Sequence, residues 1–255
     1  MDRILIESDA RLWALTLALA MLAAWRVGWW MGGRLRAGGG EPPASKFNDA
    51  SLALLSLLLA FTFGMSLAKH DHRRDMVIAD STAIGDFYTC VSLLKDPVRT
   101  KLQNVIREYA NLRVEVASTE SNETTLESAL QRFERMHSQM TDLVAEALRD
   151  GTPIAVSLTN TLDGVTSNYI ARLAAVKDRL PASILLLLFV SALVPALLEG
   201  RQQGAEARTD VTGTLCFILV VILSVYVTLD LNQPQRGLVT VSQEPMTRVL
   251  SSMTK

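Results

Sequence analysis

The chain contains 255 residues, of which 49% are hydrophobic and 20% are charged, and its mean hydropathy is +0.23. This composition excludes a disordered protein and is unusual for a soluble one. The formal net charge of -1 produces no strong field, so no nucleic-acid partner is expected. Two cysteines, Cys90 and Cys216, lie in segments of different character, and neither a disulfide framework nor a zinc site is expected.

Four stretches of about 20 residues are almost free of charge, which is the length that a helix needs to cross a bilayer. The first ends near the interfacial pair Trp29 and Trp30. A cleaved signal peptide is the alternative for this stretch, but acidic and basic residues are mixed before it, which favours an uncleaved span. The third stretch carries Pro195, where a kink is predicted. The predicted spans cover residues 12–31, 50–68, 181–198 and 211–229.

These spans divide the chain into an N-terminal membrane hairpin, a long polar insert, a C-terminal membrane hairpin and a tail. The predicted parts are residues 1–68, 69–180, 181–229 and 230–255. Two spans on each side of the insert place the insert and both termini on one side of the membrane. Ten basic residues flank the membrane on that side and five lie in the two hairpin loops, so the positive-inside rule favours a cytoplasmic insert and tail.

Apolar residues of the insert recur at alternating spacings of three and four, which predicts four long helices. The first continues out of the second span and ends before Asp96 and Pro97, and the second begins there. A polar turn at 118–123 and Gly151 separate the remaining helices, and the fourth is expected to lead straight into the third span. The predicted class is all-α, an integral membrane protein with two spans on each side of an inserted, elongated antiparallel helical bundle.

Two polar residues occupy positions on these apolar seams. Asp80 lies between Val77 and Ile84, and His137 lies between Phe133 and Met140. A carboxylate in a bundle core must be paired, protonated or hydrated. The favoured interpretation is that Asp80 is a buried partner of Arg73, Arg74 or His137 that fixes helix register, and a proton- or ion-sensing group is the alternative.

Three places in the sequence resemble one family, the bacterial bestrophin-like domain proteins, whose function is unknown and whose name reflects a loose similarity to bestrophin anion channels. They are residues 59–64 (LAFTFG) with Arg73, Arg74 and residues 80–85 (DSTAIG), then Tyr109, and residues 230–237 (DLNQPQRG). The resemblance covers about residues 50–245. It implies a multi-pass protein of the bacterial inner membrane that forms a homo-oligomer in the lipid bilayer.

The last of these motifs, Asp230, Asn232, Pro234 and Gly237, follows the fourth span. A helix stop with a turn is the simpler interpretation, since Pro234 prevents the helix from continuing. In bestrophins an acidic cluster after the last span holds calcium. By this resemblance Asp230 and Asn232 would supply only two of the six to eight oxygen ligands that calcium takes. No cofactor is therefore predicted, calcium remains the alternative, and the identity of any metal stays unknown. The tail is expected to end in a short helix near 246–250.

The resemblance to bestrophins favours an oligomeric channel. An enzyme is not expected, because the sequence contains no catalytic constellation. The second span is expected to line an anion-permeable pore. Its pore and gate residues are predicted to be Phe61, Phe63, Gly64 and Ser66, and an anion-attracting mouth is predicted at Lys69, Arg73 and Arg74. The alternatives are a membrane-anchored scaffold or signalling adaptor, and a sensor that uses the helical bundle.

Overall fold

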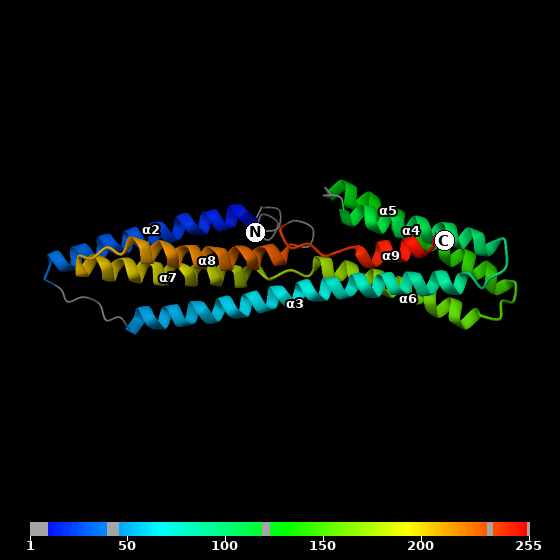
Figure 1. The fold of residues 1–255 in the computed structure, drawn as a ribbon, viewed down its shortest axis with the longest axis horizontal. Coiled ribbons are helices and arrows are strands. Elements are labelled where there is room, and N and C mark those ends of the chain that lie inside the picture. Colours follow the sequence, from blue (N-terminus) through cyan, green and yellow to red (C-terminus); the bar gives the residue numbers. More distant parts are fainter. Residues whose placement is uncertain (1–9, 40–45, 119–122, 234–236, 254–255) are drawn as a thin grey trace. The chain divides into compact units, whose positions relative to one another are not determined.

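A computed structural model describes residues 10–39, 46–118, 123–233 and 237–253. Within these ranges the chain forms helices and their connections without any strand, which confirms the all-α class (Figure 1). The helices are α2 (Ala10–Ala37), α3 (Lys46–Val91), α4 (Val98–Ser118), α5 (Glu123–Arg149), α6 (Ala155–Lys177), α7 (Ala182–Glu206), α8 (Val211–Asn232) and α9 (Glu244–Met253).

Four segments of the described chain are long and apolar enough to cross a membrane, and they belong to α2, α3, α7 and α8. The predicted uninterrupted passage from the insert into the third span is wrong. α6 ends at Lys177, Asp178 is extended with φ -74° and ψ 104°, and α7 begins only after Pro181. A residue that precedes proline avoids the helical region, which explains a break immediately before Pro181.

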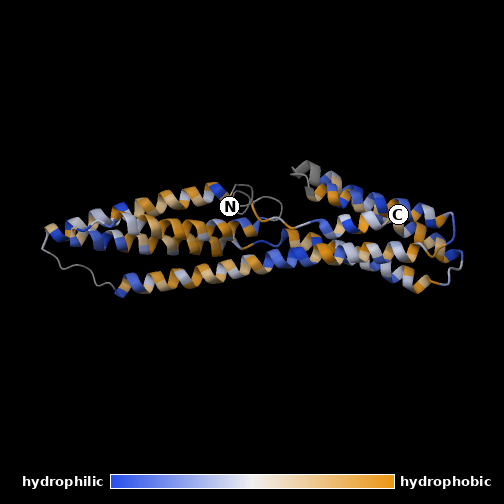
Figure 2. Ribbon diagram, viewed as in Figure 1, coloured by the Kyte–Doolittle hydropathy of each residue, from blue (hydrophilic) through white to orange (hydrophobic). Residues whose placement is uncertain are grey.

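The chain forms two compact units. The membrane unit comprises residues 1–69, 179–233 and 237–239, and the polar unit comprises residues 70–178, 234–236 and 240–255. α3 contributes its first part to the membrane unit and its second part to the polar unit. Apolar residues cover most of α8 and the first part of α7, whose last turns are hydrophilic, whereas α4 and α5 of the polar unit alternate between apolar and polar residues (Figure 2).

In the membrane unit, α2, α7 and α8 run side by side, and α2 and α7 approach each other so closely that only glycine fits (Figure 1). A Cβ added to Gly28 would lie 2.0 Å from the carbonyl oxygen of Leu197, and one added to Gly200 would lie 2.1 Å from that of Trp25. Gly32 and Gly204 repeat this one turn further along. Each helix therefore carries a pair of glycines four residues apart, which lets the two backbones touch.

In the polar unit, the seams predicted from the sequence meet in one hydrophobic core. Its largest buried side chains come from α3, α4, α5 and α6 and include Phe87, Leu102, Tyr109, Met140 and Leu158. The tail adds α9, which is longer than the short helix predicted near 246–250 and buries Met246 and Met253 in the same core. The backbone carbonyl of Met253 also accepts hydrogen bonds from Tyr88 Oη at 3.1 Å and from Arg107 Nε at 3.0 Å.

Candidate functional site

The spanning part of α3 exposes most of its circumference. Leu55, Thr62 and Ser66 form a buried stripe, with exposed fractions of 2%, 3% and 0%. Phe61 and Phe63 lie outside this stripe, with exposed fractions of 63% and 40%. At about 100° per residue, positions 61 and 63 point in directions about 200° apart on a helix. The two phenylalanines therefore do not share one face.

Gly64 and Ser66, the other residues predicted near a gate, lie on opposite sides of α3. Within the described chain nothing lies within 4 Å of a Cβ built on Gly64, so this glycine faces open space outside its own chain. Ser66 is fully buried, and within the described chain its hydroxyl has no hydrogen-bond partner. Ser66, one of the residues predicted at the gate, therefore faces the interior of its own chain.

The predicted basic mouth is also divided. Arg73 is buried, and it donates from Nε to the carbonyl oxygen of Ala175 at 3.2 Å and from Nη2 to that of Asp178 at 2.9 Å. These carbonyls end α6, where the helix dipole favours a cation. Lys69 is partly exposed and Arg74 is exposed. Arg73, which was predicted at the anion-attracting mouth, is thus directed to the end of α6 in the single chain.

Asp80 is fully buried, as the apolar seam predicted, but its partners differ from those expected. Its Oδ2 accepts from Arg172 Nη1 at 2.7 Å, and its Oδ1 lies 3.4 Å from Arg113 Nη2. Arg73 is directed to the end of α6 instead, and Arg74 is exposed. One carboxylate thus joins helices α3, α4 and α6 through two buried guanidinium groups.

Aromatic rings surround the second of these guanidinium groups. The Cζ atom of Arg113 lies 5.0 Å from the ring centre of Tyr109, 4.7 Å from that of Phe133 and 4.6 Å from that of Tyr169. Such faces attract a cation most strongly where water is excluded. Arg113 Nη2 also donates to Tyr109 Oη at 2.8 Å, so aromatic groups compensate part of its charge.

His137 completes this cluster without touching Asp80. Its Nε2 lies 3.0 Å from Tyr109 Oη, while its buried Nδ1 has no partner among the described residues. Burial and the positive charge of Arg113 lower the pKa of His137 below its ordinary 6.5, and Asp80 partly offsets this. Burial raises the pKa of Tyr109 far above its usual range. His137 is therefore held neutral at physiological pH, and its expected contact with Asp80 is replaced by one with Tyr109.

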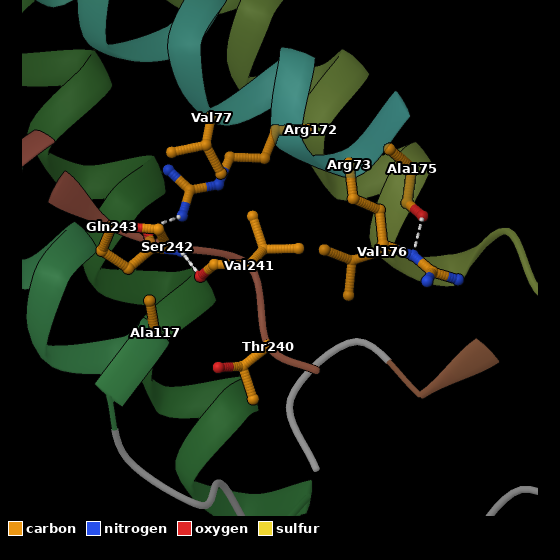
Figure 3. A pocket seen from close by; sticks show the side chains of 10 residues that line it. All are labelled: Arg73, Val77, Ala117, Arg172, Ala175, Val176, Thr240, Val241, Ser242 and Gln243. Atoms are coloured by element: carbon orange, nitrogen blue, oxygen red, sulfur yellow. Dashed lines mark hydrogen bonds between the residues drawn. The ribbon is translucent and has the colours of Figure 1, made fainter. Parts of the chain in front are cut away.

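A cavity of about 380 Å³ adjoins the charged cluster inside the polar unit (Figure 3). Arg172 donates from Nη2 to Gln243 Oε1 at 2.8 Å at one side of the cavity, and Gln243 in turn donates to the carbonyl oxygen of Val241 at 3.1 Å. The cavity is lined by Arg73, Val77, Ala117, Arg172, Ala175, Val176 and residues 240–243. Residues 240–243, which precede α9, therefore form one of its walls.

The Asp230 carboxylate at the end of α8 is taken up by backbone donors. It accepts from the N–H groups of Leu238 and Val239 at 3.0 Å, and Gly237 turns the chain with φ +124°. Asn232 Oδ1 accepts from the N–H of Leu180 at 2.8 Å. Pro234 lies outside the described residues. These contacts describe a turn held by side chains, and no group of three or more His, Cys, Asp or Glu gathers anywhere in the described ranges.

A polar network that the sequence did not predict connects the four helices of the membrane unit. Gln203 of α7 accepts from Trp25 of α2 at 3.3 Å and donates to Thr214 of α8 at 3.0 Å. Gln203 also donates to Glu199 at 2.9 Å, and Glu199 accepts from Asn48 of α3 at 2.7 Å. An ionisable residue on a membrane helix is usually paired in this way.

Four apolar helices combined with a helical polar unit define this molecule as an all-α, multi-pass membrane protein. The model of the Bestrophin-like domain matches residues 12–246. The chain therefore belongs to the bestrophin-like domain family, and the resemblance predicted from its motifs is confirmed. No curated protein matches its sequence.

Solved structures show the same fold at low sequence identity. A bacterial bestrophin homologue from Klebsiella pneumoniae, in a variant with one tryptophan replaced by alanine, is similar with a TM-score of 0.70 and 10% identity over 97% of this chain and 99% of that chain. A membrane protein with a leucine-to-alanine change is similar with a TM-score of 0.68 and 11% identity, covering 96% of this chain and 99% of that one.

Proposed function

We propose that the protein is an ion channel of the bacterial inner membrane, formed by several copies of this chain around a pore that α3 lines. The observation that supports this proposal is the outward face of α3. Leu54, Leu57 and Phe61 are more than half exposed on a helix that also leaves Gly64 open. A span that packs little against its own chain is suited to contact neighbouring copies and an aqueous pore. Bestrophin homologues, which have the same fold, add to this interpretation.

Phe61 is the better candidate for the constriction. The buried stripe through Leu55, Thr62 and Ser66 marks the side of α3 that faces its own chain. Phe61 and Gly64 are exposed away from that stripe, and Phe63, which is less exposed, flanks it. A ring of phenylalanines from several copies would form an apolar constriction, which gates by losing its water.

We propose that the pore is permeable to anions. A direct test can establish whether it favours anions or cations. With Arg73 buried, Lys69 and Arg74 are the remaining basic residues of the predicted mouth. Asp71 and Asp75 are exposed on the same stretch of α3. Two basic and two acidic groups give no net charge. The reversal potential in a chloride gradient, compared between wild type and Asp71→Asn, therefore decides which ion the pore favours.

The main test of the proposed function is ion flux into liposomes reconstituted with the full chain. Wild type should conduct, Phe61→Ala should conduct more because the constriction is wider, and Phe63→Ala should change the flux less. Phe47→Ala, at a position with 77% exposure near the start of α3, is a control for losing an exposed phenylalanine. Absence of flux from every variant, with the oligomer intact, would contradict the channel and favour a scaffold.

The proposed orientation places the polar unit and both termini in the cytoplasm. Single cysteines at Gly39, after α2, and at Asp163, an exposed position of α6, test this in a chain that lacks Cys90 and Cys216. An impermeant thiol reagent added to intact cells should label only Gly39→Cys. Labelling of Asp163→Cys instead would place the polar unit outside and would favour the sensor.

A further inference from the structure

Among the described residues of the polar unit, more positive than negative side chains are buried. Four charged side chains are buried among the residues described there, namely Arg73, Arg113, Arg172 and the single acid Asp80. A buried charge is costly unless a partner compensates it. Arg73 binds the carbonyl groups that end α6, and Arg113 lies against three aromatic rings. Among the described residues, Arg172 has neither kind of surrounding, and it shares Asp80 with Arg113.

Arg172 is also the cation at the edge of the cavity. Its Nη1 donates to Asp80, while its Nη2 donates to Gln243, whose amide oxygen carries no charge (Figure 3). Burial and the nearby Arg113 lower the pKa of Arg172, and Asp80 opposes this change. A guanidinium group matches a carboxylate with two parallel hydrogen bonds, and a neutral amide is a weaker acceptor. An anion in the cavity would therefore be a better partner for Nη2 than Gln243 is.

The walls of the cavity indicate what kind of anion fits. Val77, Val176 and Val241 provide apolar surface, with Ala117 and Ala175 between them. A volume of about 380 Å³ lies at the lower end of the range of small-molecule sites, which is roughly 300–1,000 Å³. An inorganic ion would leave these apolar walls in contact with water, whereas a short hydrocarbon chain would cover them.

We propose that this cavity binds a small organic anion, with its carboxylate on Arg172 and its short apolar body against Val77, Val176 and Val241. The segment 240–243, which forms one wall, would be held in place by the bound molecule. This site lies wholly within the polar unit, and its occupancy does not depend on whether α3 lines a pore.

The test is thermal unfolding and calorimetric titration of the full chain in detergent with hexanoate, which has one carboxylate and a short apolar chain. Hexanoate should raise the unfolding temperature in a concentration-dependent way, as any ligand of the folded state does. Hexanamide, of the same shape without the charge, and inorganic phosphate, with charge but no apolar body, should bind at least about tenfold more weakly. Equal effects of hexanoate and hexanamide, or no effect of hexanoate, would overturn the proposal.

Two variants locate the binding. Gln243→Glu places a carboxylate on Arg172 from within the chain, so it should stabilise the ligand-free protein and abolish the effect of hexanoate. Ala117→Leu fills the cavity without changing any charge and should abolish it too. Gln131→Glu adds the same charge at an exposed position of α5 and should leave hexanoate binding unchanged. If Gln243→Glu folds and binds hexanoate as well as wild type does, the anion lies elsewhere and the proposed site is wrong.

Discussion

The membrane unit and the polar unit are stabilised by opposite means. In the membrane unit, α2 and α7 meet through Gly28, Gly32, Gly200 and Gly204, where the backbones leave no room for a Cβ. In the polar unit, large aromatic and aliphatic side chains surround the buried acid Asp80. In lipid there is no hydrophobic driving force between apolar helices, so close packing of their backbones must stabilise the association. In water, burial of apolar surface stabilises the polar unit strongly enough to offset the cost of its buried charges.

The largest effect should come from filling the glycine contact. Gly200→Leu adds a side chain where a Cβ alone would lie 2.1 Å from the carbonyl oxygen of Trp25, so α2 and α7 must separate along their length. We expect a loss beyond the roughly 1–3 kcal/mol of ordinary overpacking, and no folded protein in size-exclusion chromatography.

The control is Gly33→Ala, at a glycine of the partner helix α2 that has nothing within 4 Å of the added Cβ. Because alanine is the better helix former, this change should be neutral or stabilise by up to about 1 kcal/mol. If Gly200→Leu were tolerated as well as Gly33→Ala, close packing would not be what holds the membrane unit together.

The next effect should come from the buried acid. Asp80→Ala leaves Arg113 and Arg172 buried without their shared carboxylate, and breaking a buried pair in this way costs about 3–5 kcal/mol. Chemical denaturation monitored by circular dichroism measures this loss. Asp163→Ala removes the same charge from an exposed position of α6 and should change stability by less than about 0.5 kcal/mol. Equal stability of the two variants would show that Asp80 does not hold the cluster together.

Much of the fold could be predicted because helices and spans depend on local patterns. Hydrophobic length identified the four spanning segments, and spacings of three and four identified the seams on which Leu102, Tyr109 and Met140 are buried. The same pattern placed Asp80 in the core. The break before α7 was missed, although Pro181 and the restriction on the residues before it gave a signal for it.

The partners of Asp80 were harder to predict, because they depend on which helices become neighbours. Arg113 follows Tyr109 by four residues and Arg172 follows Tyr169 by three, so both continue their seams. Arginines are mostly exposed in folded proteins, yet the structure buries both of these. The sequence also contains the glycine pairs of α2 and α7, each with a spacing of four residues. Only the folded structure shows that these two pairs lie against each other.

A smaller effect is expected from the polar network of the membrane unit. Gln203→Leu removes the contacts of Gln203 with Trp25, Glu199 and Thr214. Hydrogen bonds between membrane helices contribute on average about 0.6 kcal/mol and at most about 1.7 kcal/mol, since the unfolded helices also find partners in the membrane. We therefore expect a loss well below that of Asp80→Ala, measured by thermal unfolding in detergent.

The control for this variant is Gln202→Leu, because among the described residues the Gln202 side chain donates a hydrogen bond only to Glu206 of its own helix. It should leave the unfolding temperature nearly unchanged. A loss from Gln203→Leu as large as that from Asp80→Ala would contradict the comparison, because it would mean that polar contacts stabilise the membrane unit as strongly as buried charges stabilise the polar unit.

The smallest effect concerns pH and the polar unit alone. The pKa of His137 in the folded protein lies below its ordinary 6.5 because of burial and Arg113. As pH falls through 6.5, the unfolded chain therefore takes up a proton at this residue before the folded chain does. The stabilisation from keeping His137 neutral is complete above 6.5 and is lost as pH falls toward the lower folded pKa.

His137→Gln removes this titration while leaving a polar group beside Tyr109 Oη, which lies 3.0 Å from Nε2 in wild type. Unfolding temperatures of the two proteins, measured between pH 8 and pH 5, should therefore run parallel above about 6.5 and converge or cross below it. Wild type loses stability on acidification that the variant keeps, because only wild type must exclude a second positive charge from the surroundings of Arg113. Parallel curves over the whole range would mean that the folded and unfolded chains protonate His137 equally, and the neutral histidine would then contribute nothing to the cluster.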